Sequence, residues 1–315
     1  MKPLIVVSDG MDSNAFNNLK EELNFNVHDK SKLSQEELLE LLPNIEGLVI
    51  RSATTVTADF LEKATKLKYV IRAGEGTDNI DKVSCCQKNV KVSNTPGANN
   101  NSAAEHALAL MMTLLRKTAA ADSSMKNGKW EKAKFVGNEL TNKNIGIVGF
   151  GRIGQILAKR LQGFEPSIKF YDPFLNETDI PNCTKANSLD EIFETCEIIS
   201  VHTPLNDHTK NLIGTNLLSK MSANSILINA ARGGIVNETD LLEILKNKKI
   251  KAAALDVYSN EPLDENSEFR KLDNIVLTPH LGASTEEAQV RVGEMAVHQL
   301  KEFFLNENLL NEVKA

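Results

Sequence analysis

The chain has 315 residues, of which 41% are hydrophobic and 25% charged, and its formal net charge is −6. This length suits two domains of roughly 100–200 residues each, and the composition is typical of a soluble globular protein. We expect no nucleic-acid binding, because there is no surplus of basic residues to neutralise phosphates. No apolar run approaches the roughly 20 residues that span a bilayer, and the N-terminal run is too short for a signal peptide. We therefore expect a cytoplasmic protein without a membrane segment.

The four cysteines indicate neither a disulfide framework nor a zinc site. Cys85, Cys86, Cys183 and Cys196 form no C-x-x-C pair and no Cys/His spacing typical of zinc. We expect free thiols in a reducing compartment and no bound metal.

Short apolar runs alternate with helical runs in the first part of the chain. We predict strands at 4–7, 25–28, 47–50, 68–71 and 90–92, and helices at 16–23, 35–42 and 58–65. A long helix from about 102 to 124 follows, because Ser102 with Glu105 is a capping-box signature. Strands without polar alternation, each followed by a helix, indicate a parallel sheet covered on both faces.

A second alternating series begins at Ile145. We predict strands at 145–148, 168–171, 198–202, 225–229, 252–257 and 275–277, and helices at 153–161, 189–194 and 238–246, the last with Asn237 as N-cap. A final helix, about 285 to 304, should return to the first sheet, because the second is already complete.

The predicted fold class is therefore α/β, with two Rossmann-like, doubly wound parallel domains. One is flavodoxin-like and discontinuous, formed by residues 1–97 and 285–315. The other is a Rossmann domain at 98–284. The chain would cross between them twice, and we expect a cleft between the domains.

The turn Gly149-Phe150-Gly151-Arg152-Ile153-Gly154 predicts a dinucleotide site. It follows an apolar strand and opens a helix, and Asp172 ends the next strand, 18 residues after Gly154. This context is what a Rossmann fingerprint requires, whereas the glycines alone are a weak signal. The N–H groups at the helix start favour a pyrophosphate. Asp172 would bind ribose hydroxyls and repel a 2′-phosphate, which predicts NAD rather than NADP.

Three further residues have the chemistry that hydride transfer to a 2-hydroxy acid needs, which is a cation, a proton carrier and a group that orients the carrier. His280 follows the strand at 275–277, and strand ends are where open α/β sheets place their sites. Arg232 follows another strand and could bind a carboxylate bidentately. Glu261 could hold the His280 ring. Each has an ordinary structural alternative, a turn arginine, a loop glutamate or a structural histidine.

The order of motifs resembles the D-isomer-specific 2-hydroxyacid dehydrogenases over nearly the whole chain. The motifs are the glycine turn followed by His202-Thr203-Pro204-Leu205, Ala231-Arg232-Gly233-Gly234, Ala254-Leu255-Asp256-Val257, Glu261-Pro262 and Pro279-His280-Leu281-Gly282. The resemblance implies that Arg232, Glu261 and His280 are catalytic. It implies NAD binding by Gly149, Gly151, Arg152, Ile153, Gly154, Asp172, Thr203, Ala230, Arg232, Asp256, His280, Gly282 and Ala283.

Within the family, the resemblance is strongest to the branch that oxidises D-3-phosphoglycerate. It rests on Arg51-Ser52-Ala53-Thr54, Arg72-Ala73-Gly74, Asn94-Thr95-Pro96-Gly97 and the segment Gly128–Gly137. This branch implies that the discontinuous domain binds substrate, through Arg51, Ser52, Arg72, Gly74 and Gly76. It also implies a homodimer in which Lys132 enters the partner's site. Larger members carry a C-terminal regulatory region after the position of the last predicted helix, and we expect neither this region nor inhibition by serine here.

Glu75 departs from the family pattern, because a carboxylate near an anionic substrate should repel it unless it pairs with an arginine or turns away. Two alternatives therefore stay open. One is the same chemistry on glyoxylate, hydroxypyruvate or a longer 2-keto acid. The other, of a different class, is an NAD(H)-sensing corepressor-like protein that keeps the same residues.

Overall fold

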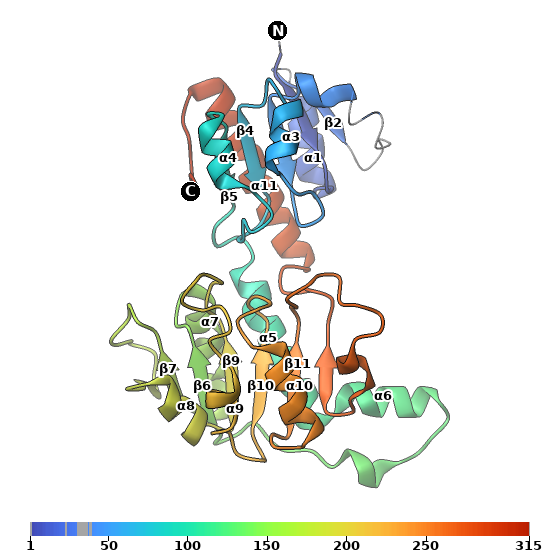
Figure 1. Cartoon of the computed structure of the whole chain (residues 1–315), viewed down its shortest axis with the longest axis vertical. Helices are drawn as coiled ribbons and strands as arrows, with labels where there is room; N and C mark the ends of the chain where they lie inside the picture. Colours follow the sequence, from blue (N-terminus) through green and yellow to red (C-terminus); the bar gives the residue numbers. More distant parts are fainter. Residues whose placement is uncertain (1, 23, 30–36, 38–39, 315) are drawn as a thin grey trace. The chain divides into compact units, whose positions relative to one another are not determined.

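The computed structural model describes residues 2–22, 24–29, 37 and 40–314, and the chain divides into two compact units (Figure 1). The first unit contains Met1–Asn99 and Ala283–Ala315, and the second contains Asn100–Gly282. The chain therefore passes from one unit to the other twice. These limits differ by two residues at each crossing from the expected ones.

The first unit is built on a five-stranded sheet in which every pairing is parallel. The strand order is β2-β1-β3-β4-β5, which is the flavodoxin-like arrangement. The strands are β1 (Leu4–Val7), β2 (Asn26–Asp29), β3 (Gly47–Ile50), β4 (Tyr69–Arg72) and β5 (Lys91–Asn94). All four residues of β1 and β3 are buried, as expected for strands with helices on both faces.

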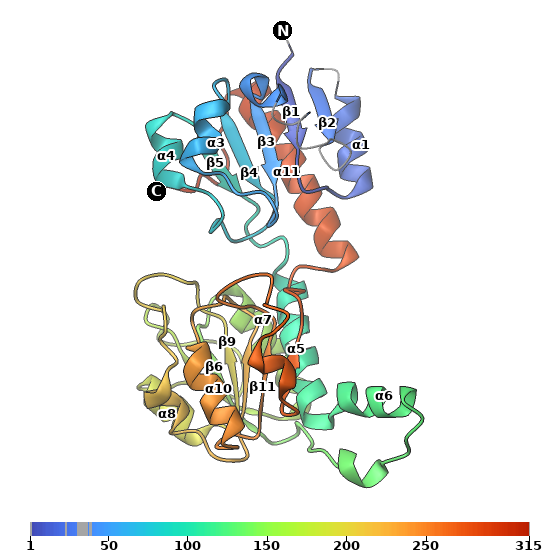
Figure 2. The ribbon, with the colours of Figure 1, turned by 45° about the vertical axis from the view of Figure 1, so that its right-hand side comes forward.

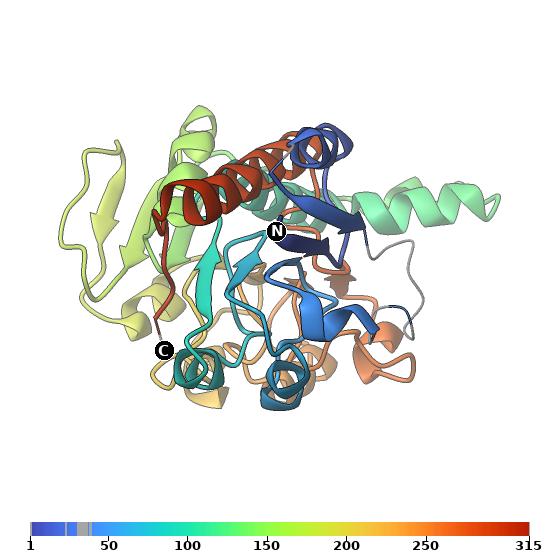
Figure 3. The same ribbon diagram turned by 90° about the horizontal axis from the view of Figure 1, so that it is seen from above.

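Helices cover both faces of this sheet (Figures 2 and 3). On one face α1 (Ser13–Glu21) and α11 (Glu286–Asn306) bury Leu19 and Leu300 against Val7. On the other, α3 (Ala58–Lys63) and α4 (Lys82–Gln87) bury Leu61 and Cys85. The last helix of the chain thus completes the core of the first sheet.

The second unit contains a seven-stranded sheet, again parallel throughout. Its order is β12-β11-β10-β9-β6-β7-β8, the Rossmann order with a seventh strand, and the direction of winding reverses between β6 and β9. The strands are β6 (Asn144–Val148), β7 (Ser167–Tyr171), β8 (Cys183–Lys185), β9 (Ile198–Val201), β10 (Ile226–Asn229), β11 (Ala252–Leu255) and β12 (Ile275–Leu277).

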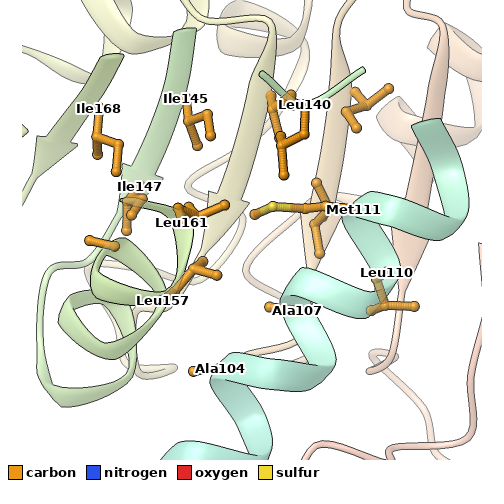
Figure 4. Packing of buried hydrophobic residues seen from close by; sticks show 14 of the residues in the cluster. Ala104, Ala107, Leu110, Met111, Leu140, Ile145, Ile147, Leu157, Leu161 and Ile168 are labelled. Carbon is orange, nitrogen blue, oxygen red and sulfur yellow. The ribbon is translucent and has the colours of Figure 1, made fainter. Parts of the chain in front are cut away.

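Two helices pack on one face of the second sheet and three on the other. Helices α5 (Asn100–Arg116) and α7 (Arg152–Leu161) share one core, in which Ala104, Ala107 and Met111 lie near Leu157 and Leu161 (Figure 4). The opposite face is covered by α8 (Leu189–Thr195), α9 (Thr215–Leu218) and α10 (Glu238–Lys246). The α/β fold class with two doubly wound parallel sheets is confirmed.

The long helix predicted at 102–124 is wrong in its start and its continuity. Helix α5 begins at Asn100, so Ser102 lies buried in its first turn and is not its cap. Lys117 then adopts a left-handed conformation with φ 53°, which ends α5, and α6 (Thr118–Lys126) starts anew. The sequence pattern missed this break because strong helix formers continue across it.

Other differences concern short elements and boundaries. Strand β8 and helices α4 and α9 have no counterpart in the prediction, because three to six residues carry little periodicity. Of the helix predicted at 35–42, residues 35, 36, 38 and 39 lie outside the described residues, Glu37, Glu40 and Leu41 are helical, and Leu42–Asn44 forms a short 3₁₀ helix. Asn237 caps α10 through its side chain, as predicted.

We predict that Leu300→Ala destabilises the first unit by about 2–5 kcal/mol, because the fully buried Leu300 fills the space between α11 and the sheet. The amides of β1 and β3 should then exchange faster with deuterium. Val83→Ala on α4 is the control, since Val83 is 58% exposed and its loss should cost little. Equal protection of β1 in the two variants would contradict the packing of α11 on this sheet.

Candidate active site

The functional residues predicted in the second unit, apart from Lys132, all follow the carboxyl ends of strands. Because the sheet is parallel, these ends lie along one edge, where open α/β sheets place their ligands. In the order of the sheet they are His280 and Gly282 after β12, Asp256 and Glu261 after β11, Ala230 and Arg232 after β10, Thr203 after β9, the turn Gly149–Gly154 after β6, and Asp172 after β7.

The glycine turn is shaped by two close backbone approaches and one open position. Gly149 has φ +88°, and a Cβ there would lie 2.8 Å from the backbone nitrogen of Thr203. A Cβ on Gly154 would lie 2.5 Å from the carbonyl oxygen of Gly149. At Gly151, the N-cap of α7, a Cβ would meet nothing within 4 Å. This leaves room beside the uncapped start of α7, which suits a pyrophosphate.

Asp172, which we predicted to bind the ribose, holds the turn. Its Oδ2 accepts a hydrogen bond from the backbone N–H of Phe150 at 2.8 Å, and its Oδ1 accepts one from Phe174 at 2.9 Å. Each carboxylate oxygen keeps a second lone pair for a ligand hydroxyl. Sequence reasoning assigned the ribose contact alone and did not anticipate this bracing of the turn.

The Thr203 hydroxyl is a buried polar group that points to a ligand. Its Oγ1 has no hydrogen-bond partner within the part of the chain that the structure describes. Such atoms are costly unless something bonds them. Together with the open side of Gly151, this atom fits the presence of a dinucleotide at this edge of the sheet.

His280 and Glu261 form a close pair. The His280 Nδ1 lies 2.7 Å from Glu261 Oε2, and Glu261 Oε1 accepts the backbone N–H of Tyr258 at 3.0 Å. Burial raises the pKa of Glu261, but the bonds from His280 and Tyr258 outweigh it, and the net pKa is lowered. The carboxylate is therefore ionised at neutral pH, as a partner for an imidazolium must be.

The backbone at His280 is left-handed, with φ 56°. A non-glycine residue in this region costs of order 1 kcal/mol or more, and such strain gathers at functional sites. The His280 N–H is held by the carbonyl oxygen of Asp256 at 2.8 Å. The surrounding loop therefore imposes the direction in which the imidazole leaves the chain.

Arg232 lies in a loop that is pressed against the Glu261 loop. Asn229, the last residue of β10, donates from Nδ2 to the carbonyl oxygen of Arg232 at 2.9 Å. A Cβ on Gly233 would come within 1.8 Å of the carbonyl oxygen of Tyr258, so only glycine fits there. The Arg-Gly pair thus joins the loops after β10 and β11.

The first unit carries Arg51 and Arg72 at the carboxyl ends of the adjacent strands β3 and β4. Asp9, which follows β1, accepts the backbone N–H of Arg51 at 2.6 Å and that of Thr54 at 2.9 Å. Sequence reasoning missed Asp9. Its place at the strand-order reversal between β1 and β3 is the signal that could have identified it.

Gly74 and Glu75 shape the loop after β4. A Cβ on Gly74 would lie 1.4 Å from Arg72 Nη1, so the glycine makes room for the guanidinium. The Glu75 Oε2 accepts the backbone N–H of Gly97 at 2.8 Å. The carboxylate that departs from the family pattern is thus engaged by the neighbouring turn.

The other predicted residues are more exposed. Ser52 is exposed, Gly76 is partly exposed, and Lys132 is exposed on a 3₁₀ helix (Lys132–Phe135) that follows α6.

Across residues 2–22, 24–29, 37 and 40–314, no helix is long and apolar enough to span a membrane. The same described residues contain no group of three or more His, Cys, Asp or Glu side chains arranged to hold a metal ion.

Comparison with known proteins identifies relatives along the whole chain. Residues 108–282 match the family described as "D-isomer specific 2-hydroxyacid dehydrogenase, NAD binding domain". This match lies within the second unit and confirms NAD as the cofactor predicted from the glycine turn.

Two curated relatives and one solved structure illustrate the similarity. D-3-phosphoglycerate dehydrogenase of Archaeoglobus fulgidus is 44% identical over 85% of this chain, which spans 51% of that protein. Hydroxypyruvate reductase of Thermotoga maritima is 44% identical over 93% of this chain and 96% of its own length. NAD-dependent formate dehydrogenase of Staphylococcus aureus, solved with NAD, is 30% identical with a TM-score of 0.88, covering 100% of this chain and 99% of that one.

The chain spans about half the length of the Archaeoglobus relative and nearly all of the Thermotoga relative. The family match covers more than half of the residues, and both relatives exceed 40% identity. The chain therefore belongs to the D-isomer-specific 2-hydroxyacid dehydrogenase family.

Proposed function

We propose that the chain is an NAD-dependent dehydrogenase that interconverts D-3-phosphoglycerate and 3-phosphohydroxypyruvate. The observation that carries the proposal is the bond of 2.7 Å between His280 and Glu261, on the sheet edge that also holds Arg232 and the NAD turn. This arrangement supplies a proton carrier, its orienting carboxylate and a cation on one edge.

The cofactor would be held by the residues that fit it. The N–H groups at the start of α7 would bind the pyrophosphate, Asp172 the ribose, and the Thr203 hydroxyl a polar atom of the dinucleotide. When bound, NAD accepts the hydride and NADH donates it.

Three side chains would act on the substrate. Arg232 would bind the carboxylate and polarise the C2 carbonyl. Because the Nδ1 of His280 is bonded to Glu261, Nε2 is left to face the substrate oxygen. His280 would give its proton to that oxygen in reduction and take it back in oxidation. Glu261 would stabilise the imidazolium and hold the ring.

The phosphorylated substrate is favoured by the cations of the first unit. Arg51 and Arg72 follow neighbouring strands, and a substrate with carboxylate and phosphate needs more than one cation in an otherwise acidic protein. Glu75 was expected to repel an anionic substrate unless its carboxylate was engaged elsewhere. Because this carboxylate accepts the backbone N–H of Gly97, Glu75 is a weaker argument against the phosphorylated substrate.

Hydroxypyruvate is the second candidate substrate. The Thermotoga relative bears the name hydroxypyruvate reductase and matches this chain over nearly its full length. Reduction of hydroxypyruvate would use Arg232, Glu261 and His280 in the same way, and only the need for Arg51 and Arg72 distinguishes the two substrates.

We also propose a homodimer formed through residues 118–136, which follow α5 and are called the arm here. Helix α6 has no buried residue within its nine positions, and three apolar side chains of the arm are exposed, Met125 (53%), Trp130 (81%) and Val136 (74%). Exposed apolar side chains gathered on one arm indicate a surface that another protein covers. In such a dimer, Lys132 would reach the partner's site.

Assays of NADH oxidation with 3-phosphohydroxypyruvate, hydroxypyruvate, glyoxylate and 2-ketoisocaproate test the proposed substrate. We expect the highest kcat/KM for the phosphorylated acid, and Arg51→Gln should reduce that kcat/KM more than the value for hydroxypyruvate. A preference for an unphosphorylated acid would refute the substrate, and no turnover with any of the four would favour an NAD(H) sensor.

Substitutions at the His280–Glu261 pair test the mechanism. His280→Ala should lower kcat by about 10²–10⁴-fold while NADH binding, measured by fluorescence titration, persists. Glu261→Gln removes the charge that favours the imidazolium. As pH rises, the rate of keto-acid reduction should therefore begin to fall at a lower pH in this variant than in the wild type. Loss of NADH binding with turnover preserved per bound cofactor would refute the role of His280, and an unchanged pH profile would refute that of Glu261.

The single tryptophan, Trp130, reports on the proposed dimer. Dilution below the dissociation constant should shift its fluorescence to longer wavelength as the ring becomes solvated, and sedimentation should show dimers passing to monomers over the same range. Trp130→Glu should sediment as a monomer, whereas Phe174→Glu, at a site 94% exposed outside the arm, should not. A wild-type chain that is monomeric at all concentrations would exclude the dimer.

A further inference from the structure

The buried carboxylate of Asp256 holds the loop that carries His280. Its side chain is fully buried, and its Oδ1 and Oδ2 accept the backbone N–H groups of Leu281 at 2.7 Å and Gly282 at 2.9 Å. The Asp256 carbonyl oxygen accepts the N–H of His280 at 2.8 Å. Three successive amides of the loop are thus bound to one residue at the end of β11.

This binding is what maintains the left-handed backbone of His280. With φ 56°, the residue is in a conformation that the chain leaves unless neighbouring bonds hold it. If Leu281 and Gly282 lost their acceptors, His280 could relax, and its imidazole would lose its direction toward the substrate. The position of the proton carrier therefore depends on the position of the Asp256 carboxylate.

A histidine on helix α5 is bonded to that carboxylate. The His106 Nε2 lies 3.1 Å from Asp256 Oδ1 and 3.2 Å from Thr278 Oγ1, and Thr278 Oγ1 donates to Asp256 Oδ1 at 2.6 Å. A carboxylate only accepts hydrogen bonds, so Nε2 must carry the hydrogen. The His106 side chain is 17% exposed, so this bond is largely shielded from water.

Helix α5 also lies close to the same loop. A Cβ on Gly282 would lie 3.9 Å from the Cβ of Ala103, one turn before His106, and 3.5 Å from Asp256 Oδ2. The loop after β12 therefore lies near α5 and is linked through Asp256 to a side chain of α5. Helix α5 itself is fixed by its packing beside α7 (Figure 4).

We propose that His106 is a positioning residue for the reaction, which fixes the Asp256 carboxylate so that the 280–282 loop presents His280 to the substrate. This inference rests on the proposed function, because it assigns His280 the proton transfer. His106 touches neither His280 nor the reacting atoms and acts through Asp256 and the loop.

The charge of Asp256 shows what the bond contributes. Burial raises the pKa of Asp256, whereas the hydrogen bonds from His106, Thr278 and Leu281 lower it, and the net pKa lies below its usual value. A neutral carboxyl would be a weaker acceptor for the two loop amides. His106 therefore supports both the position and the ionised state of the carboxylate.

The test compares His106→Leu with His106→Gln in the full chain. Leucine has a similar size and no donor, whereas the amide of glutamine can place an N–H near the position of Nε2. Single-turnover oxidation of NADH should slow about 10- to 100-fold in His106→Leu, as expected for a misplaced catalytic group. In His106→Gln it should recover to within about threefold, and the Kd for NADH should change less than threefold in both variants.

Hydrogen exchange gives a readout that does not depend on turnover. The amides of Leu281 and Gly282 should exchange faster in His106→Leu than in the wild type and regain protection in His106→Gln. Amides of β6 and β9 serve as internal controls and should keep their protection. If no acid is turned over but exchange responds as stated, the proposed function fails while the control of the loop by His106 stands.

A second pair of variants covers the case in which His106→Leu does not fold. Thr278→Val removes the other side-chain donor to Asp256 Oδ1 and leaves His106 without its neighbour, whereas Thr278→Ser keeps the donor. We expect slower hydride transfer and faster exchange at 281 and 282 in Thr278→Val alone. A wild-type rate and wild-type exchange in His106→Leu, or a His106→Gln no better than His106→Leu, would overturn the proposal, as would identical behaviour of the two Thr278 variants.

Discussion

The parallel direction of every strand is the constraint on which the rest of the structure depends. In a parallel sheet all carboxyl ends lie along one edge, so residues far apart in sequence are collected there without specific long-range contacts. Six neighbouring strands of the second unit end next to predicted functional residues. Burial of both sheet faces by helices makes the strands apolar and leaves the edge loops as the place for polar chemistry.

Close backbone approach then shapes the loops at this edge. Gly149 and Gly233 each occupy a position where a Cβ would overlap a neighbouring loop, and a Cβ on Gly154 would overlap Gly149 in the same turn. Three carboxylates hold these loops by hydrogen bonds. Asp172 binds the backbone of the glycine turn, Glu261 binds the His280 imidazole, and Asp256 binds the backbone of the loop that carries His280. Each of these carboxylates accepts backbone N–H groups, and at Glu261 and Asp256 the hydrogen bonds that order the loops also lower the pKa of the acid.

Much of the fold could be predicted, because apolar strands followed by helices and a glycine turn in its proper context are local patterns. The residues that sequence reasoning missed act through contacts between distant segments. Asp9 orders the Arg51 loop, and His106 meets Asp256 across 150 positions of sequence. The break at Lys117 was also missed, since it depends on a single left-handed residue within a helix-forming stretch. Sequence periodicity contains no signal for any of these.

We propose above all that NAD and a 2-hydroxy acid meet at the carboxyl edge of the second sheet. A crystal structure of the chain with NAD⁺ and an unreactive 2-hydroxy acid analogue tests it most directly. We expect the pyrophosphate against the start of α7, the analogue's carboxylate on Arg232, and its hydroxyl oxygen about 3 Å from His280 Nε2. An analogue bound with its hydroxyl away from His280, or a dinucleotide bound away from the Gly149–Gly154 turn, would contradict it.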